Sequence, residues 1–157
     1  MQRLQKGLMK PTLQTRLTVL VVDDSDVFRT RLCALLREDA RIEIIGEARD
    51  VREALALFEA ARPDAVVLDY CLSDGTAVAV LRHVKQLAPR CIVLMLTNLR
   101  EPVFEQVCLM SGADYFFHKA TDFERVPEVL GQLATRLTEA PVSHGNPQRF
   151  NIPPEPC

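Results

Sequence analysis

The chain has 157 residues and a mass of 17.7 kDa, the usual size of one domain, and 48% of its residues are hydrophobic. Its 19 Lys and Arg residues nearly balance 21 Asp and Glu residues, which argues against a nucleic-acid backbone as the main partner. The five cysteines form no Cys-x-x-Cys pair, and no apolar run approaches the roughly 18 residues of a membrane span. We therefore expect a cytoplasmic protein without a disulfide framework or a zinc site.

Both ends of the chain differ in composition from its centre. Residues 1–16 contain four basic residues and no acidic one, are interrupted by Pro11, and predict a flexible basic arm. Residues 139–157 contain five of the ten prolines and predict a Pro-rich disordered tail. Residues 17–138 are expected to form the folded domain.

The first predicted strand, Leu17–Val22, is a continuous run of leucine and β-branched residues, which is typical of a strand buried on both faces of a sheet. The polar residues 23–25 end this strand and can cap a helix whose apolar residues recur at helical spacing up to about Arg37. Ile42–Ala48 is predicted as the second strand. Apolar residues at helical spacing over 54–61 then predict a second helix.

The second half of the domain repeats this alternation of short apolar runs and apolar residues at helical spacing, punctuated by Pro and Gly. Pro102 opens its middle helix and Gly112 closes it. The predicted elements are, in order, the strand Ala65–Leu68, a turn at 73–75, a helix over 78–87, the strand Cys91–Leu96, a helix over 102–111, the strand Asp114–His118 and a helix from between Asp122 and Pro127 to Leu137.

Five strands alternating with five helices predict right-handed β-α-β crossovers and therefore a parallel sheet. Because the central strands are apolar throughout, helices must cover both faces of this sheet. The sequence thus predicts a doubly wound α/β fold. In such a sheet, ligands bind outside the carboxyl ends of the strands.

Polar residues end or follow four of the predicted strands. Asp23 and Asp24 follow the first strand, Asp69 the third, Thr97 the fourth and Lys119 the fifth. Three carboxylates in one pocket repel one another, and a hard divalent cation such as Mg2+ relieves the repulsion. An amine and a hydroxyl suit phosphoryl oxygens, and a carboxylate can attack phosphorus. The set indicates Mg2+-dependent phosphoryl transfer to an aspartate.

Four motifs, in order, make residues 17–137 resemble the receiver domain of two-component response regulators. They are VLVVDDS from Val19, VVLDYCLSDG around Asp69, LMLTN around Thr97 and GADYFFHK ending at Lys119. The resemblance implies a five-stranded sheet with the flavodoxin-like order 2-1-3-4-5. It also implies a protein that accepts a phosphoryl group from a sensor histidine kinase or a histidine phosphotransfer protein and is not itself an enzyme.

The resemblance also implies a phosphoacceptor and a metal site. Asp69 would accept the phosphoryl group. Magnesium would be held by Asp23, Asp24, Asp69 and the backbone carbonyl of Cys71.

Thr97 and Lys119 would bind the phosphoryl group, and Thr97 together with Phe116 would form a conformational switch. Because Phe116 and Phe117 alternate on one strand, one of the two must face the core, so a plain packing role for Phe116 stays open. His118, inside the same strand, is expected to be structural.

Four positions depart from the pattern of the family. Ser73 stands where many receivers have proline, and Asn98 stands where a small residue usually follows the threonine. Ala120 replaces the common proline or aspartate, and Phe116 replaces a frequent tyrosine. These changes leave the phosphorylation residues in place and bear on kinetics and on the partner surface instead.

Three other functions are open to a chain with this predicted fold. In magnesium-dependent phosphatases with an aspartyl nucleophile, a second acidic residue lies two positions after the nucleophile and acts as the general acid. This chain has Cys71 at that position. A Rossmann nucleotide-binding domain has glycines after its first strand, whose amides bind the pyrophosphate. This chain has acidic residues there instead. A receiver-like interaction scaffold that is never phosphorylated remains the alternative, and a phosphorylation assay separates it from the main hypothesis.

The tail after Leu137 has no helix-turn-helix pattern. The output is therefore expected to be a contact with a downstream protein, or else to come from an output domain in a longer parent chain. We expect this contact on the helix over 102–111, the fifth strand and the last helix. The sequence predicts no DNA-binding output domain and no direct nucleic-acid partner, and it leaves a homodimer open.

Overall fold

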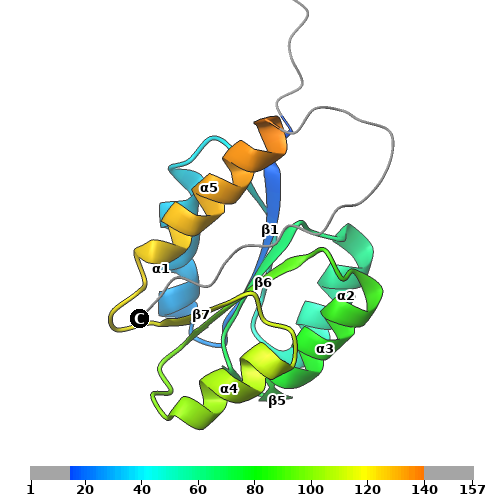
Figure 1. Ribbon diagram of the computed structural model, residues 1–157, viewed down its shortest axis with the longest axis vertical. Coiled ribbons are helices and arrows are strands. Elements are labelled where there is room, and N and C mark those ends of the chain that lie inside the picture. Colours follow the sequence, from blue (N-terminus) through cyan, green and yellow to red (C-terminus); the bar gives the residue numbers. More distant parts are fainter. Residues whose placement is uncertain (1–14, 140–157) are drawn as a thin grey trace, which may run out of the picture.

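The computed structural model describes residues 15–139, which form a five-stranded parallel sheet in the order β2-β1-β3-β6-β7 (Figure 1). The strands are β1 (Leu17–Val22), β2 (Ile42–Ala48), β3 (Ala65–Leu68), β6 (Ile92–Thr97) and β7 (Tyr115–His118). The helices are α1 (Asp26–Arg37), α2 (Val51–Ala61), α3 (Ala77–Leu87), α4 (Pro102–Met110) and α5 (Arg125–Glu139). Because β6 and β7 are the fourth and fifth strands of this sheet, the predicted doubly wound α/β fold and its order 2-1-3-4-5 are confirmed.

The predicted arm and tail lie almost wholly outside the described residues, so both stay predictions. Within residues 15–139, every helix is too short or too polar to cross a membrane.

The bounds of the elements agree closely with the prediction, with one omission. β1, β2 and β3 begin and end as predicted, whereas β6 lies one residue later because Thr97 still pairs with His118. A second sheet, in which β4 (Cys71–Leu72) pairs antiparallel with β5 (Gly75–Thr76), was not predicted. Strands of two residues have no periodicity to detect, and only the turn between them was predicted.

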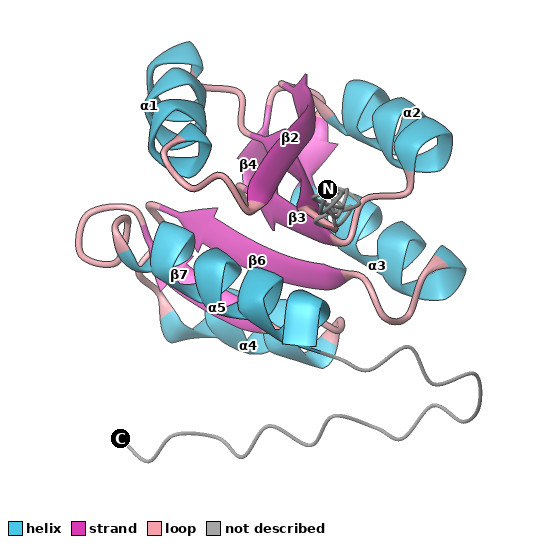
Figure 2. Ribbon diagram, turned by 90° about the horizontal axis from the view of Figure 1, so that it is seen from above, coloured by secondary structure: helices cyan, strands magenta, loops and turns pink. Residues whose placement is uncertain are grey.

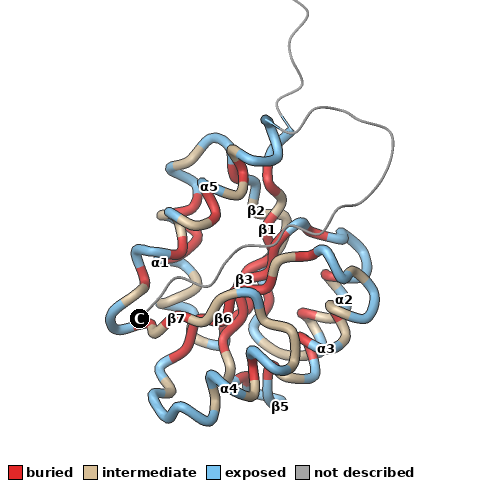
Figure 3. Tube along the Cα trace, viewed as in Figure 1, coloured by how far each residue is buried: buried red, intermediate tan, exposed pale blue. Residues whose placement is uncertain are grey.

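Helices cover both faces of the main sheet (Figures 1 and 2). α1 and α5 pack on one face, where their buried side chains form one apolar cluster with the strands. α2, α3 and α4 cover the opposite face and contribute to a second cluster. β1, β3 and β6 are buried almost throughout their length (Figure 3). This two-sided burial explains why their sequences are continuous apolar runs.

A carboxylate from a distant turn caps helix α2. Asp74, between β4 and β5, accepts hydrogen bonds from the N–H groups of Val51 at 2.7 Å and Arg52 at 3.2 Å. Asp50, the N-cap residue itself, accepts from the N–H of Glu53 at 2.7 Å. These bonds satisfy N–H groups that a helix start leaves unpaired. The hydrogen bond from Val51 is the largest cause that holds the pKa of Asp74 below its ordinary 3.8.

Asp74→Asn is expected to lower the melting temperature at neutral pH, because asparagine lacks the negative charge favoured at a helix start. A carboxyl group whose pKa is lowered by folding stabilises the fold above its unfolded pKa, and this stability is lost as the pH falls through the folded pKa. The melting temperatures of the two chains should therefore converge as the pH falls below 3.8. Thermal unfolding followed by circular dichroism tests this, and an undiminished gap in acid would contradict it.

Candidate functional site

Polar residues from four strand ends meet at the carboxyl edge of the main sheet. Backbone pairing continues past the strands there: the Asp69 N–H donates to the carbonyl of Val22 at 2.9 Å, and the Lys119 N–H donates to the carbonyl of Thr97 at 2.9 Å. These bonds place Asp69 beside the end of β1 and Lys119 beside the end of β6. The side chains of the site are thus attached to buried strands, which limits their movement.

Three carboxylates lie close together at this edge. One oxygen atom each from Asp23, Asp24 and Asp69 lies within 4.8 Å of the other two. Asp23 and Asp69 are 4% and 7% exposed, whereas Asp24 is open to solvent. Magnesium is bound by a few carboxylate oxygens and keeps several of its waters, so it needs such an open side. The donor set therefore fits a divalent cation.

Lys119 forms ion pairs with two of the three carboxylates. Its Nζ atom lies 2.5 Å from Asp23 Oδ2 and 2.8 Å from Asp69 Oδ2, and its side chain is 3% exposed. Burial alone would lower the pKa of Lys119, but the hydrogen bonds to Asp23 and Asp69 outweigh it and hold the pKa above 10.5. Lys119 is therefore a fixed positive charge at the site.

Asp23 keeps a raised pKa despite this ion pair. Desolvation by burial is the largest cause, and the nearby charge of Asp69 adds to it, while the hydrogen bonds from Lys119 and the Ser25 N–H act in the opposite direction. The Ser25 N–H donates to Asp23 Oδ1 at 2.9 Å. One ammonium thus compensates two buried carboxylates only in part, and a second cation at the site would be stabilised.

Cys71 lies on β4, two residues after Asp69, and its side chain is exposed. Partial burial, followed by the charges of Asp69 and Asp24, raises the pKa of its thiol above 9.0. Magnesium prefers oxygen ligands to sulfur. The backbone carbonyl, the group that the resemblance implies, is the oxygen that Cys71 offers.

The two predicted switch residues lie on neighbouring strands. Thr97 is 1% exposed, and its hydroxyl oxygen accepts from the Leu99 N–H at 3.3 Å. Phe117 is the aromatic residue that packs under α1 and α5, whereas half-buried Phe116 packs on the opposite face of the sheet. The Phe116 ring meets His118 edge-on, with centroids 5.5 Å apart, and His118 Nδ1 has no hydrogen-bond partner among the described residues.

Two contacts of the site were not predicted. The Phe28 ring of α1 lies against Lys119, with its centroid 4.4 Å from Nζ. Arg29 donates to the backbone carbonyl of Asp23 at 2.7 Å. The sequence places Phe28 on the apolar face of a helix, but helical spacing does not say which strand end that face meets. Both residues lie in the first turns of the helix that follows Asp24, and this closeness in sequence was the signal that could have predicted their contacts with the site.

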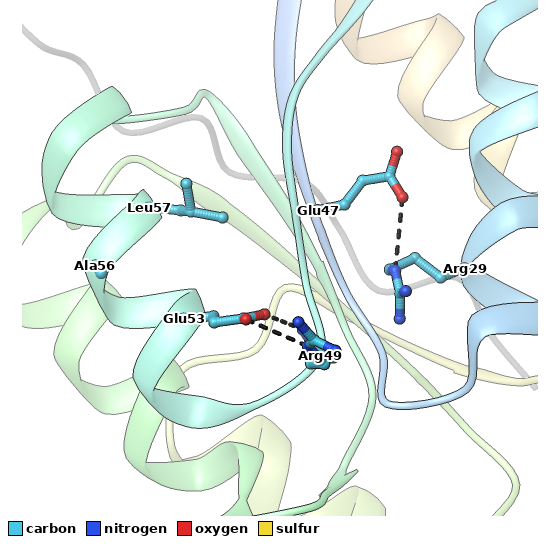
Figure 4. Close-up of a pocket in the computed structure, with 6 residues that line it drawn as sticks. All are labelled: Arg29, Glu47, Arg49, Glu53, Ala56 and Leu57. Carbon is cyan, nitrogen blue, oxygen red and sulfur yellow. Dashed lines mark hydrogen bonds and ion pairs between the residues drawn. The ribbon is translucent and has the colours of Figure 1, made fainter.

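A separate pocket lies between α1, β2 and α2 (Figure 4) and is lined by Arg29, Glu47, Arg49, Glu53, Ala56 and Leu57. Its charged groups pair with one another: Arg29 Nε lies 3.5 Å from Glu47 Oε2, and Arg49 Nε lies 3.2 Å from Glu53 Oε1. None of the predicted site residues lines it. We therefore assign the candidate site to the carboxylate cluster.

Comparison with curated proteins gives relatives in two functional groups. The chain is 29% identical over 140 residues to protein-glutamate methylesterase/protein-glutamine glutaminase 1 of Pseudomonas aeruginosa, which covers 88% of this chain and 38% of that protein. It is 36% identical over 103 residues to the DNA-binding transcriptional activator DevR/DosR of Mycobacterium tuberculosis, which covers 64% of this chain and 46% of that protein. The matched regions thus span less than half the length of either relative.

The fold and the sequence profile indicate one family. The signal receiver domain of NarL from Mycobacterium tuberculosis superposes with a TM-score of 0.70 at 27% identity, over 76% of this chain and 97% of that one. The family described as the response regulator receiver domain matches residues 19–130. Since this match runs from β1 into α5, the chain belongs to the receiver-domain family of two-component response regulators.

Proposed function

We propose that this chain accepts a phosphoryl group on Asp69, with Mg2+ held by Asp23, Asp24, Asp69 and the backbone carbonyl of Cys71. Phosphoryl acceptance and Mg2+ binding are general for receiver domains. The observation that supports the proposal for this chain is the position of Lys119, whose Nζ lies 2.8 Å from Asp69 and 2.5 Å from Asp23. A buried ammonium thus stands beside the acceptor, where phosphoryl oxygens need a cation.

The proposed reaction transfers a phosphoryl group from a phosphohistidine of a histidine kinase or a phosphotransfer protein. A carboxylate oxygen of Asp69 attacks phosphorus and the P–N bond breaks. The histidine nitrogen keeps the electron pair and takes a proton from solvent. Bound Mg2+ would offset the charge of the donor and the carboxylates. Lys119 pairs with one phosphoryl oxygen, and the Thr97 hydroxyl donates to another.

Incubation with Mg2+ and phosphoramidate, followed by intact-mass spectrometry, tests this proposal. We expect the mass of one added phosphoryl group with Mg2+ and no added mass with excess chelator. Labelling that survives the chelator would contradict the metal site. A chain that stays unlabelled in Mg2+ would favour the interaction scaffold that is never phosphorylated.

The proposed output is a protein contact on the surface formed by α4, β7 and α5. α4 exposes Val103 (56%), Leu109 (45%) and Met110 (86%), and α5 exposes Leu137 (40%). Exposed apolar residues that cluster are typical of protein-binding surfaces, and three of these four lie on the nine-residue helix α4. The partner in this proposal is a downstream protein, a second copy of the chain in a homodimer included, rather than nucleic acid.

Thr97 and Phe116 connect Asp69 to that surface in the proposed switch. The Thr97 oxygen already accepts a bond from Leu99, so its hydrogen is free to donate to a phosphoryl oxygen. Movement of Thr97 toward Asp69 would vacate space beside β6, into which the half-buried Phe116 ring can turn. A charge-assisted hydrogen bond of about 1.5–3 kcal/mol is large enough to bias two packings a few kcal/mol apart.

Thr97→Ala is expected to keep phosphorylation at Asp69 and to lose the response of α4. Beryllofluoride with Mg2+ mimics the phosphoryl group, and amide NMR shifts follow its effect residue by residue. We expect shifts on α4 and β7 in the unmodified chain and in Thr97→Ser, which keeps the hydroxyl. In Thr97→Ala the shifts should stay near Asp69, and α4 shifts of unchanged size would contradict the switch.

A further inference from the structure

The Lys119 ammonium lies between two carboxylates and an aromatic ring. The ring belongs to Phe28, and its centroid is 4.4 Å from Nζ. This distance lies within the roughly 6 Å over which a cation is attracted to a ring face. Because Lys119 is only 3% exposed, water screens this attraction little.

Lys119 has one more hydrogen-bond donor than it has oxygen partners, and the Phe28 ring lies against this ammonium group. An ammonium has three N–H donors, and the oxygens of Asp23 and Asp69 account for two contacts. Within residues 15–139, Nζ makes no hydrogen bond or ion pair with a third oxygen, so the Phe28 ring is the remaining partner. Burial of an ammonium with an unpartnered N–H is costly, and the electron-rich ring face reduces that cost.

Other side chains hold the Phe28 ring in place. Phe123, in the segment between β7 and α5, meets it edge-to-face, with centroids 6.0 Å apart and an interplanar angle of 62°. Phe123 is 5% exposed, and the Arg31 guanidinium covers its ring at 4.7 Å from the centroid. Phe28 is therefore packed between Lys119 on one side and a supported aromatic ring on another.

We propose that Phe28 is a positioning residue for phosphoryl transfer, which holds the Lys119 ammonium beside Asp69 through the face of its ring. This inference rests on the proposed function of Asp69. When the Asp69 oxygen bonds to phosphorus, Lys119 must exchange a carboxylate oxygen for a phosphoryl oxygen. A ring face attracts a cation without requiring one hydrogen-bond direction, so Phe28 stabilises the ammonium before and during this exchange.

Fluorinated phenylalanines test the electrostatic role of the ring. One, two or three fluorine atoms at position 28 weaken the negative potential of the ring face in steps while nearly keeping its shape. We expect the rate of labelling by phosphoramidate in saturating Mg2+ to fall at each step, by roughly 3- to 30-fold in total. Phe28→Leu, which keeps an apolar side chain without a ring, should be as slow as the trifluoro chain.

The same substitutions at Phe58, which is fully buried in the cluster under α2 and α3, serve as the control. They should leave the labelling rate unchanged, and thermal unfolding should show that every chain is folded. Equal rates across the position-28 series, or equal losses in both series, would overturn the role of Phe28 and leave the proposed function of Asp69 standing. No labelling of the unmodified chain in Mg2+ would overturn the proposed function, and with it this inference.

Discussion

Asp69→Asn is expected to gain no phosphoryl mass under conditions that label the unmodified chain. A neutral carboxamide lacks the anionic oxygen that attacks phosphorus, and it also removes one of the three carboxylates that fit a metal. The substitution nearly conserves size, so the chain should remain folded. Intact-mass spectrometry after incubation with phosphoramidate and Mg2+ measures the result.

Asp24→Asn is the matched control, because it changes an exposed carboxylate of the same cluster and keeps the nucleophile. We expect this chain to be labelled, but only at a higher Mg2+ concentration. Its thermal stability without metal should rise, because one of the repelling charges is removed. If Asp69→Asn were labelled as much as the unmodified chain, another residue would be the phosphoacceptor.

Lys119→Met is expected to cause the largest loss of stability. Methionine fills a similar volume, but it leaves the buried carboxylates of Asp23 and Asp69 without the cation that lies within 2.8 Å of both. Removal of one member of a buried ion pair costs about 3–5 kcal/mol because the remaining charge is uncompensated. We therefore expect a loss of this size at neutral pH in the presence of chelator.

The loss should depend on pH in a definite direction. Burial already raises the pKa of Asp23 above 3.8, and removal of Lys119 raises it further. A group whose pKa is raised by folding stabilises the fold below its unfolded pKa, and this stability is lost as the pH rises through the folded pKa. The two chains should thus differ little in acid, and the gap should widen as the pH rises through the raised pKa of Asp23.

Urea unfolding at acid and neutral pH, with chelator and with Mg2+, measures this gap. A divalent cation at the carboxylates replaces the lost charge, so we expect Mg2+ to recover a large part of the stability of Lys119→Met at neutral pH. Equal stability of the two chains at neutral pH in chelator would contradict the assignment of Lys119 as the counter-ion of the cluster.

Much of this architecture follows from local patterns in the sequence. Runs such as Ala65–Leu68 predict strands buried on both faces, and alternation with helices leads to a parallel sheet. Topology then brings the carboxyl ends of the strands together, which explains why residues as distant as Asp23 and Lys119 could be predicted at one site. This rule holds for any number of residues between the strands in the sequence.

Other features depend on tertiary packing that no local pattern reports. Alternation on β7 shows that Phe116 and Phe117 face opposite sides, but only the packing of α1 and α5 identifies Phe117 as their core residue. The contact of Phe28 with Lys119 depends on the rotation and tilt of α1 above the sheet. The capping of α2 by Asp74 depends on a hairpin whose strands have two residues each.

Chemical identification of the phosphorylated residue tests the central claim most directly. Borohydride reduces an aspartyl phosphate to homoserine, so the labelled chain can be reduced, digested and sequenced by mass spectrometry. We predict homoserine at position 69 after treatment with phosphoramidate and Mg2+, and aspartate there when a chelator is present. Homoserine at another aspartate, or a phosphoryl group on a residue that borohydride does not reduce, would contradict the account.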